Sequence, residues 1–318
     1  MILTLLLFAV GVGVLIGGAW ILVGGGTRVA AVLGVPAVVV GLTVVAFGTS
    51  APELFVSLVG ALRGNSGIAL GNVIGSNVAN LGLILGLAAL LQPVKVEAAL
   101  RRREVPLMLA VSMVFAAMVW DGELSRLDAG VLTVGFVVFL EWTRRGAARG
   151  LAEVPVPELD IDPAHKAREL VRGAGLVLLG VVGLAGGGRL IVVNAVEIAG
   201  QLGASETLIG LTLVAVGTSL PELATTVVAA ARKQDDLALG NIVGSNIFNI
   251  LAVAGPVGLV RPLVQEAGHG RLQLACMVAV AGLLYVMVAP ARGDVGRRHG
   301  ALLLAVYAAV MVIWTAWP

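Results

Sequence analysis

Charge and aromatic side chains are scarce in this sequence. Of its 318 residues only 13% are charged and 4% aromatic, whereas 58% are hydrophobic. A soluble protein of this length needs far more charge to cover its surface, so the composition excludes a soluble globular domain. The apolar content is too high for a disordered chain, the glycines follow no collagen period, and a single cysteine excludes a disulfide scaffold. The composition therefore predicts a polytopic membrane protein.

Ligands for soft metals and features of nucleic-acid binding are also missing. His165, His269 and His299 lie in or beside expected loops, and we interpret Cys276, alone in an apolar run, as a packing residue. These positions argue against a zinc or copper transporter. The net charge is only +2 and no dense basic block is present, so we expect no nucleic-acid partner. No Cys/His cluster or nucleophile motif indicates an enzyme, and we expect no cofactor and no obligatory protein partner.

Ten apolar runs are bounded by charged or turn-forming residues, and each is near the roughly 20 residues that a helix needs to cross a bilayer. The first run has no positive residue before it and is long for a signal sequence, so we interpret it as an uncleaved span. We expect an all-α membrane protein with ten transmembrane helices, at residues 2–23, 35–61, 67–91, 104–120, 126–142, 173–196, 206–230, 237–259, 269–289 and 300–317.

One long polar stretch, residues 143–172, separates five expected spans from five. In this layout 16 Lys and Arg residues lie on the same side of the membrane as this stretch, four lie on the opposite side, and Arg189 lies inside a span. The positive-inside rule therefore predicts a cytoplasmic linker and two extracytoplasmic termini. The absence of a targeting segment favours the cell (inner) membrane of a prokaryote. We expect a five-helix unit at 1–142, the linker at 143–172 and a second unit at 173–318.

The two halves are related by an internal duplication with an offset of 169 residues. The segment GTSAPE at 48–53 aligns with GTSLPE at 217–222, and GNVIGSN at 71–77 aligns with GNIVGSN at 240–246. Within residues 41–86, 23 of the 46 positions match their partners without a gap. Because each half has an odd number of spans, the second half enters the membrane from the opposite face. Such inverted repeats are common in secondary transporters, although pores can be built this way too.

Glu53 and Glu222 occupy equivalent positions deep in expected spans. A charge at the bilayer centre costs about 2.5–3.5 kcal/mol on insertion scales, so we interpret both as functional groups that face a cavity. The alternative, a protonated or loop-capping Glu, fits poorly with recurrence in both repeats. Pro52 and Pro221 stand directly before them and cannot donate backbone hydrogen bonds, which predicts a break in each helix and exposed carbonyl oxygens.

Neutral oxygen-bearing residues accompany each Glu. Thr49 and Ser50 precede Glu53 by four and three residues, which on a helix places their hydroxyls on its face. An all-oxygen set of this kind suits hard cations such as Ca²⁺ and Na⁺. For the neighbouring Gly71 and Gly75, close helix packing is the preferred interpretation. On the next span, Asn72, Ser76 and Asn80 form a polar stripe at four-residue spacing. The second repeat reproduces both groups, with Thr218 and Ser219 before Glu222 and the stripe at Asn241, Ser245 and Asn249.

The paired motifs and the ten-span inverted layout resemble the sodium/calcium exchanger family of the cation/Ca²⁺ exchanger superfamily, in its compact prokaryotic form. The resemblance implies that Glu53 and Glu222 are shared ligands of Ca²⁺ and Na⁺, with Asn80 and Asn249 at the middle of the cluster. The K⁺-dependent branch has Asp where this chain has Asn249, which argues against K⁺ cotransport. The resemblance implies further ligands at Thr49, Thr218, Ser50, Ser219, Ala46, Ala215, Ser76 and Ser245.

The charge of the expected site supports ion exchange. With both Glu ionised the empty site carries −2, and moving it through an occluded apolar state is expensive. One Ca²⁺ or several Na⁺ compensate this charge, so exchange of Na⁺ for Ca²⁺ by alternating access is the preferred hypothesis. Two protons would also neutralise the site, which keeps a Ca²⁺/H⁺ or other cation/proton antiporter open. A passive cation channel is a more remote alternative.

Overall fold

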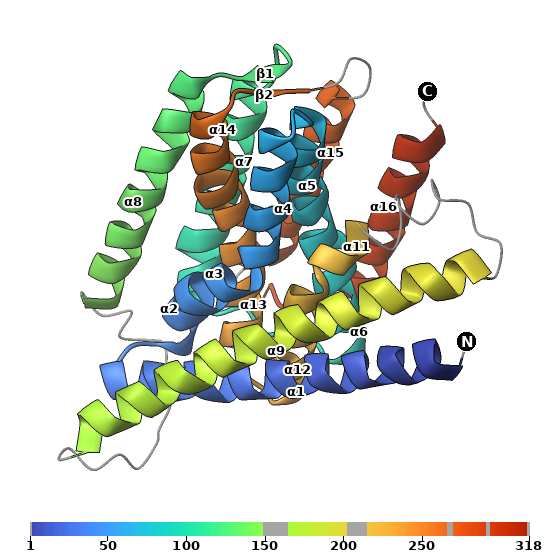
Figure 1. Cartoon of the computed structure of the whole chain (residues 1–318). Coiled ribbons are helices and arrows are strands. Elements are labelled where there is room, and N and C mark those ends of the chain that lie inside the picture. Colours follow the sequence, from blue (N-terminus) through green and yellow to red (C-terminus); the bar gives the residue numbers. More distant parts are fainter. Residues whose placement is uncertain (1, 149–164, 202–214, 266–269, 291–292, 317–318) are drawn as a thin grey trace.

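The computed structural model describes residues 2–148, 165–201, 215–265, 270–290 and 293–316, and nearly all of them are helical (Figure 1). The first half contains α1 (Ile2–Leu33), α2 (Ala37–Val40), α3 (Ala46–Thr49), α4 (Ala51–Leu62), α5 (Ser66–Ala79), α6 (Leu85–Leu91), α7 (Val105–Met118), β1 (Glu123–Leu124) and α8 (Arg126–Ala148). The second half contains α9 (Lys166–Gln201), α11 (Ala215–Thr218), α12 (Leu220–Ala231), α13 (Asp235–Phe248), α14 (Gly255–Val260), β2 (Leu263–Val264), α15 (Gly270–Val288) and α16 (Arg297–Ala316). The described residues also include π-helical turns at Gly41–Val45, Asn80–Ile84, Leu100–Glu104 and Asn249–Ala254.

Six helices in the described ranges are long and apolar enough to cross a membrane: Ile2–Leu33, Ser66–Leu91, Lys166–Ile198, Asp235–Val260, Gly270–Val288 and Arg297–Trp314. Ala37–Thr49 and Ala51–Leu62 meet at 44° and make a seventh span if they are taken together. Of the other expected spans, 104–120 and 126–142 coincide largely with α7 and α8, while 206–230 begins outside the described residues. The count of ten stays a prediction.

The helices α1 and α9 are longer than the apolar runs that predicted them, and they cross in front of the other helices in Figure 1. They pack so closely that a Cβ added to Gly18 would lie 2.8 Å from the backbone nitrogen of Leu184. A Cβ on Gly180 would lie 2.6 Å from the backbone nitrogen of Leu22. Small residues permit this close approach of two membrane helices, and polar contacts of Thr4 with Glu197 and of Arg28 with Glu169 also join the pair.

Two groups of buried apolar residues stabilise the fold. One runs through α5, α7, α13 and α15 and includes Phe115, Ile74 and Ile247. The other lies where α1 and α9 meet α12 and includes Leu22 and Leu184. The second group attaches the α1–α9 pair to the helix that carries Glu222, so these two long helices have a direct packing connection to the candidate site.

Short backbone pairings join the two halves. β1 pairs antiparallel with β2, with Leu124 opposite Leu263, and a separate bridge joins Val94 to Val295. Figure 1 shows β1 and β2 at the upper end of the molecule, whereas α6, which precedes Val94, lies at its lower end. Each pairing takes one strand segment from each half, so the halves are connected at both ends of the bundle.

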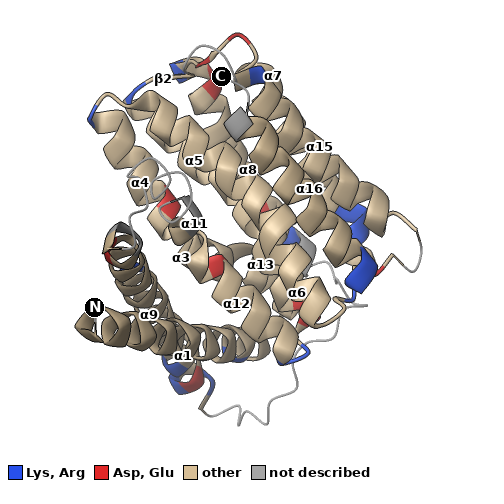
Figure 2. Ribbon diagram, turned by 90° about the vertical axis from the view of Figure 1, so that its right-hand side faces the viewer, with Lys and Arg blue, Asp and Glu red and all other residues tan. Residues whose placement is uncertain are grey.

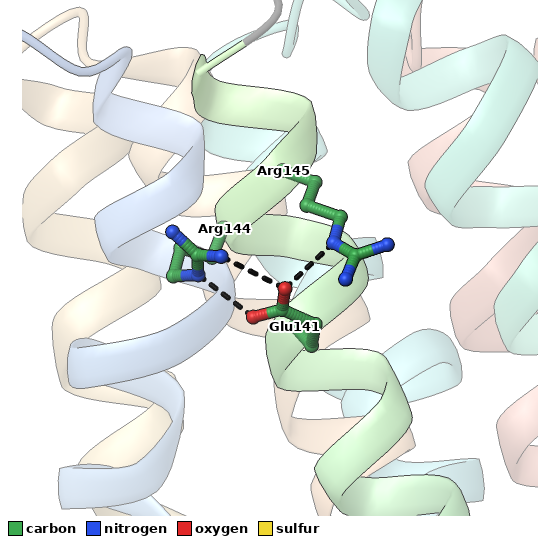
Figure 3. Close-up of polar contacts among 3 residues, drawn as sticks. All are labelled: Glu141, Arg144 and Arg145. Carbon is green, nitrogen blue, oxygen red and sulfur yellow. Dashed lines mark hydrogen bonds and ion pairs between the residues drawn. The ribbon is translucent and has the colours of Figure 1, made fainter.

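Charged residues gather mainly at the ends of the helices, with long uncharged stretches of helix between them (Figure 2). At the end of α8, the Glu141 carboxylate accepts hydrogen bonds from Arg144 at 2.7 and 2.8 Å and from Arg145 at 2.6 Å (Figure 3). Exposed ion pairs of this kind contribute little to stability, because water screens the charges. Their position fits an anchor near a membrane surface rather than a part of the core.

Candidate functional site

Both Glu side chains lie at a break in a helix. α3 and α4 meet at Ser50, which has φ −84° and ψ 5°. The second repeat breaks in the same way, because Ser219 has φ −88° and ψ 5° between α11 and α12. Pro52 and Pro221 lie in the first turn of the new helix, where a missing N–H costs no hydrogen bond. The break that the sequence predicts before each Glu is confirmed.

The two carboxylates are buried at these breaks. Glu53 is 1% exposed in the first turn of α4, and Glu222 is 0% exposed in the first turn of α12. The N-terminal turn of a helix carries a partial positive charge, which stabilises an anion. The two carboxylates lie close enough to repel each other. Among the described residues, neither oxygen of Glu53 nor Oε2 of Glu222 has a hydrogen-bond partner.

Hydroxyl groups of each repeat face the carboxylate of the other. Ser50 Oγ donates to Glu222 Oε1 at 3.1 Å. Thr218 and Ser219 lie beside the Glu53 carboxylate. From the sequence we expected the Ser50 hydroxyl to share a helix face with Glu53. That expectation is wrong for Ser50, because its hydroxyl contacts Glu222 instead. The helix breaks at Ser50 itself, so the i to i+3 relation does not hold and the hydroxyl points to the opposite repeat.

Thr49 connects the broken helix of the first repeat with α13. Its Oγ1 lies 3.2 Å from Asn241 Oδ1 and 3.4 Å from Ser245 Oγ. The carbonyl oxygen of Ala46 lies 3.3 Å away from the same hydroxyl. Carbonyl, hydroxyl and amide oxygens from both repeats therefore gather at one buried point, next to the carboxylate pair.

Asn80 and Asn249 each begin a π-helical turn, although no periodicity in the sequence signals one. The Asn249 amide donates through Nδ2 to Asn77 Oδ1 at 3.1 Å, and this leaves Asn249 Oδ1 without a partner among the described residues. Neither amide atom of Asn80 has a partner there, although the side chain is only 1% exposed. A buried polar group without a partner costs about 1–3 kcal/mol, and π-helical turns are frequent at functional sites.

Two other members of the predicted polar stripe brace the helices. Asn72 Nδ2 donates to Ser57 Oγ at 2.9 Å and to the carbonyl oxygen of Glu53 at 3.1 Å. Asn241 Nδ2 donates to Thr226 Oγ1 at 3.1 Å. These bonds join α4 to α5 and α12 to α13 at equivalent places in the two repeats. The amides thereby fix the helix pairs on which the carboxylates lie.

The remaining predicted residues lie in the same region. Ser76 is 4% exposed and Ser245 is fully buried. Ala215 is the first residue of α11, but its side chain lies outside the described residues. Thr225 was missed by the sequence reasoning because its counterpart in the first repeat carries no oxygen. It lies one turn after Glu222, is fully buried, and its hydroxyl has no partner among the described residues.

The composition of this centre limits what it can bind. Within the described part of the chain, no group of three or more His, Cys, Asp and Glu side chains is placed to hold a metal ion. The centre instead combines two carboxylates with hydroxyl, amide and carbonyl oxygens. Such a set suits hard cations, which bind oxygen, and not metals that prefer thiolate or imidazole.

The sodium/calcium exchanger protein family matches residues 3–143 and 172–316 of this sequence. The chain belongs to the sodium/calcium exchanger family. Its relatives are exchangers and antiporters rather than enzymes, and their ions are transported substrates and not cofactors. The exchanger is therefore a helical integral membrane protein with an antiporter's architecture.

Three similar proteins illustrate the relationship. The putative antiporter CaxA of Alkalimonas amylolytica is 36% identical over 320 residues, covering 96% of this chain and 97% of its own length. The inner membrane protein YrbG of Escherichia coli is 36% identical over 291 residues, covering 89% and 86%. A structure of the sodium-calcium exchanger NCX_Mj, soaked with Na⁺ and Ca²⁺, superimposes with a TM-score of 0.84 at 34% identity and covers 99% of both chains.

Proposed function

We propose that this exchanger moves Na⁺ and Ca²⁺ in opposite directions across a prokaryotic cell membrane, through one central site that contains Glu53 and Glu222. The observation that carries the proposal is the pair of buried carboxylates with three oxygen atoms that lack partners among the described residues. An unpaired buried charge is strongly unfavourable, so the site favours occupation by cations. The similarity to the sodium-calcium exchanger NCX_Mj supports cation exchange, and the similarity to the putative antiporter CaxA supports antiport.

The proposed ligands are the two carboxylates and the neutral oxygens around them. Crossed contacts such as the hydrogen bond from Ser50 to Glu222 support one site shared by both repeats rather than two separate sites. The Oδ1 atom of Asn249 and the amide of Asn80 would complete the centre. The full set proposed is Glu53, Glu222, Thr49, Thr218, Ser50, Ser219, Ala46, Ala215, Ser76, Ser245, Asn80 and Asn249.

The charge of the site couples the two fluxes. With both carboxylates ionised, the empty site carries two buried negative charges, and an occluded state would bury them without solvent. One Ca²⁺ or several Na⁺ remove that cost. The loaded exchanger can therefore change the side to which the site opens, while the empty exchanger is held back, and neither ion leaks.

We propose a layout of ten transmembrane helices in two inverted five-helix repeats, at 1–142 and 173–318, joined by a cytoplasmic linker at 143–172. The equivalent breaks at Ser50 and Ser219 support the repeat, as do the equivalent bonds of Asn72 and Asn241. Inverted repeats that meet at discontinuous helices are a common design of secondary transporters. Both termini would then face the extracytoplasmic side.

Uptake of radioactive Ca²⁺ tests the coupling. Proteoliposomes loaded with Na⁺ are diluted into Na⁺-free buffer at clamped pH, with the wild type, Glu222→Gln and Glu104→Gln compared. Glu104 is a buried carboxylate outside the site, so its variant controls for the loss of a buried charge. We expect uptake that follows the Na⁺ gradient, is lost in Glu222→Gln and persists in Glu104→Gln. Uptake that persists in Glu222→Gln would refute the proposed site.

A Ca²⁺/H⁺ antiporter is the second candidate, because the two carboxylates lie close together and two protons neutralise them as two Na⁺ do. The same vesicles distinguish the two. Uptake that ignores Na⁺ but follows an imposed proton gradient would establish proton coupling, with Glu53 and Glu222 as the proton carriers. A passive channel would instead give Ca²⁺ flux without any counter-ion.

A further inference from the structure

Arg189 is a cation within a membrane helix that the exchange mechanism does not use. It lies in α9, 17 residues after Arg172 and eight residues before Glu197. At 1.5 Å per residue, Arg189 lies about 12 Å along the helix axis from Glu197. Arg189 is exposed, and no ion pair joins it to a carboxylate among the described residues. Glu197, in the same helix, accepts a hydrogen bond from Thr4 at 3.2 Å. An arginine without a partner within a membrane span is costly, so binding of an anion would stabilise it.

The same side chain lines a cavity of about 520 Å³ between α9 and the two broken helices. The walls are otherwise mainly apolar, and Pro52 and Pro221 contribute one side. Phe55 and Val193 also line the cavity, and they are 69% and 56% exposed. The apolar stretch of α9 is only 28% buried within the protein, so this flank faces the hydrocarbon of the bilayer.

We propose that this cavity binds an anionic phospholipid of the surrounding bilayer, with an acyl chain between α9 and α4 and the phosphate on the Arg189 guanidinium. The exposed apolar rim allows a chain to enter sideways from the membrane. Arginine binds phosphate through two parallel hydrogen bonds, and its long side chain can extend toward the headgroup region. A zwitterionic lipid would bring its own ammonium group beside the guanidinium, which favours a lipid with net negative charge.

The lipid site adjoins the cation site but does not contain its carboxylates. Thr218, one of the proposed cation ligands, lines the cavity, whereas Glu53 and Glu222 do not, although Pro52 and Pro221 precede them directly. A bound chain would therefore contact the broken helices beside the proposed cation site. The proposal does not depend on which ions are exchanged, so lipid binding can be measured on the resting protein.

Native mass spectrometry of the delipidated exchanger, titrated with phosphatidylglycerol or phosphatidylcholine, tests this proposal. For Arg189→Gln we expect binding of phosphatidylglycerol to weaken about fivefold, the effect of one basic residue near a membrane surface, with phosphatidylcholine unaffected. Arg189→Lys should retain most of the preference. Arg126→Gln is the matched control, because Arg126 is also exposed and lies outside the cavity.

A second variant tests the position of the acyl chain. Ala185 lines the cavity, so Ala185→Phe should fill part of it and weaken binding of both lipids while Arg189 stays in place. Equal losses in Arg189→Gln and Arg126→Gln would show that the lipid follows surface charge alone and would overturn the proposal. Unchanged binding in Ala185→Phe would overturn it as well, because the chain would then lie elsewhere.

Discussion

At the scale of single residues, the site is defined by buried oxygen atoms whose hydrogen-bonding capacity is unused. The carboxylate of Glu53 is the clearest case, since neither oxygen has a partner among the described residues. The amide of Asn80 is similar. A cation bound at the proposed site would remove these costs together, so we expect ion binding to stabilise the protein.

Glu53→Gln should show the effect of the charge at the site, because Gln has nearly the shape of Glu but no charge. The variant removes one of two repelling buried charges, so we expect a higher unfolding temperature than the wild type in the absence of Ca²⁺. We also expect the Ca²⁺-induced stabilisation to vanish; in the wild type it should reach about 2.7 kcal/mol at a concentration 100 times the dissociation constant. Thermal unfolding in detergent with and without Ca²⁺ measures both effects. A variant that Ca²⁺ still stabilises like the wild type would contradict the role of Glu53.

Asn77 should act as a positioning residue for Asn249. Its Oδ1 accepts the Asn249 amide, which leaves the Asn249 oxygen available. Asn77→Leu removes this acceptor at a cost of about 1–3 kcal/mol, and we expect weaker Ca²⁺ binding in addition to lower stability.

The matched control for Asn77 is its repeat counterpart Asn246, whose amide donates to the carbonyl of Ile242 in its own helix at 2.8 Å. Asn246→Leu should leave the Ca²⁺ affinity near that of the wild type. Calcium titrations of both variants check this difference. If the two variants bind Ca²⁺ equally well, the bond from Asn249 to Asn77 does not orient the ligand.

At the scale of elements, the packing of α1 on α9 depends on glycines at particular positions. A Cβ on Gly18 would lie 2.8 Å from a backbone nitrogen of α9, whereas one on Gly17 would meet nothing within 4 Å. We expect Gly18→Ala to destabilise the protein by about 1–3 kcal/mol through overpacking. Gly17→Ala should be neutral or stabilising by up to about 1 kcal/mol through helix propensity. Thermal unfolding of the two neighbouring variants gives the comparison, and equal effects would refute close packing.

The sequence predicted some elements well because their causes are local. A proline directly before each Glu is enough to break a helix, and the breaks at Ser50 and Ser219 follow from it. The π-helical turns at Asn80 and Asn249 could not be predicted in this way. Each adds one residue to a turn of an otherwise α-helical segment, and no residue type at these positions marks such an insertion.

Contacts across the molecule were equally beyond the sequence. The motif suggested that Ser50 belongs with Glu53, yet it donates to Glu222, 172 residues away. The repeat itself was visible, and it identified both members of each pair. Which member faces which is decided by how the two halves dock, and no residue spacing within one half contains that information.

At the scale of the whole molecule, the proposed topology places the linker and the expected span ends on defined sides. In a Cys276→Ala background, Lys166→Cys should react with an impermeant thiol reagent only from the cytoplasmic side. Arg126→Cys should react only from the opposite side. Both residues are exposed and lie at the first residue of a long helix. Labelling of right-side-out and inverted vesicles measures this, and reaction of both cysteines from one side would overturn the layout.

The central claim is that the two repeats together build one cation site. Calorimetric titration of the purified exchanger with Ca²⁺ in Na⁺-free buffer tests it most directly, with the wild type, Glu53→Gln and Glu222→Gln compared. We predict one Ca²⁺ bound per wild-type chain, and loss of that binding in each variant alone, because each carboxylate serves the same ion. Two Ca²⁺ per chain, or one variant that keeps the wild-type affinity, would show that the repeats carry separate sites.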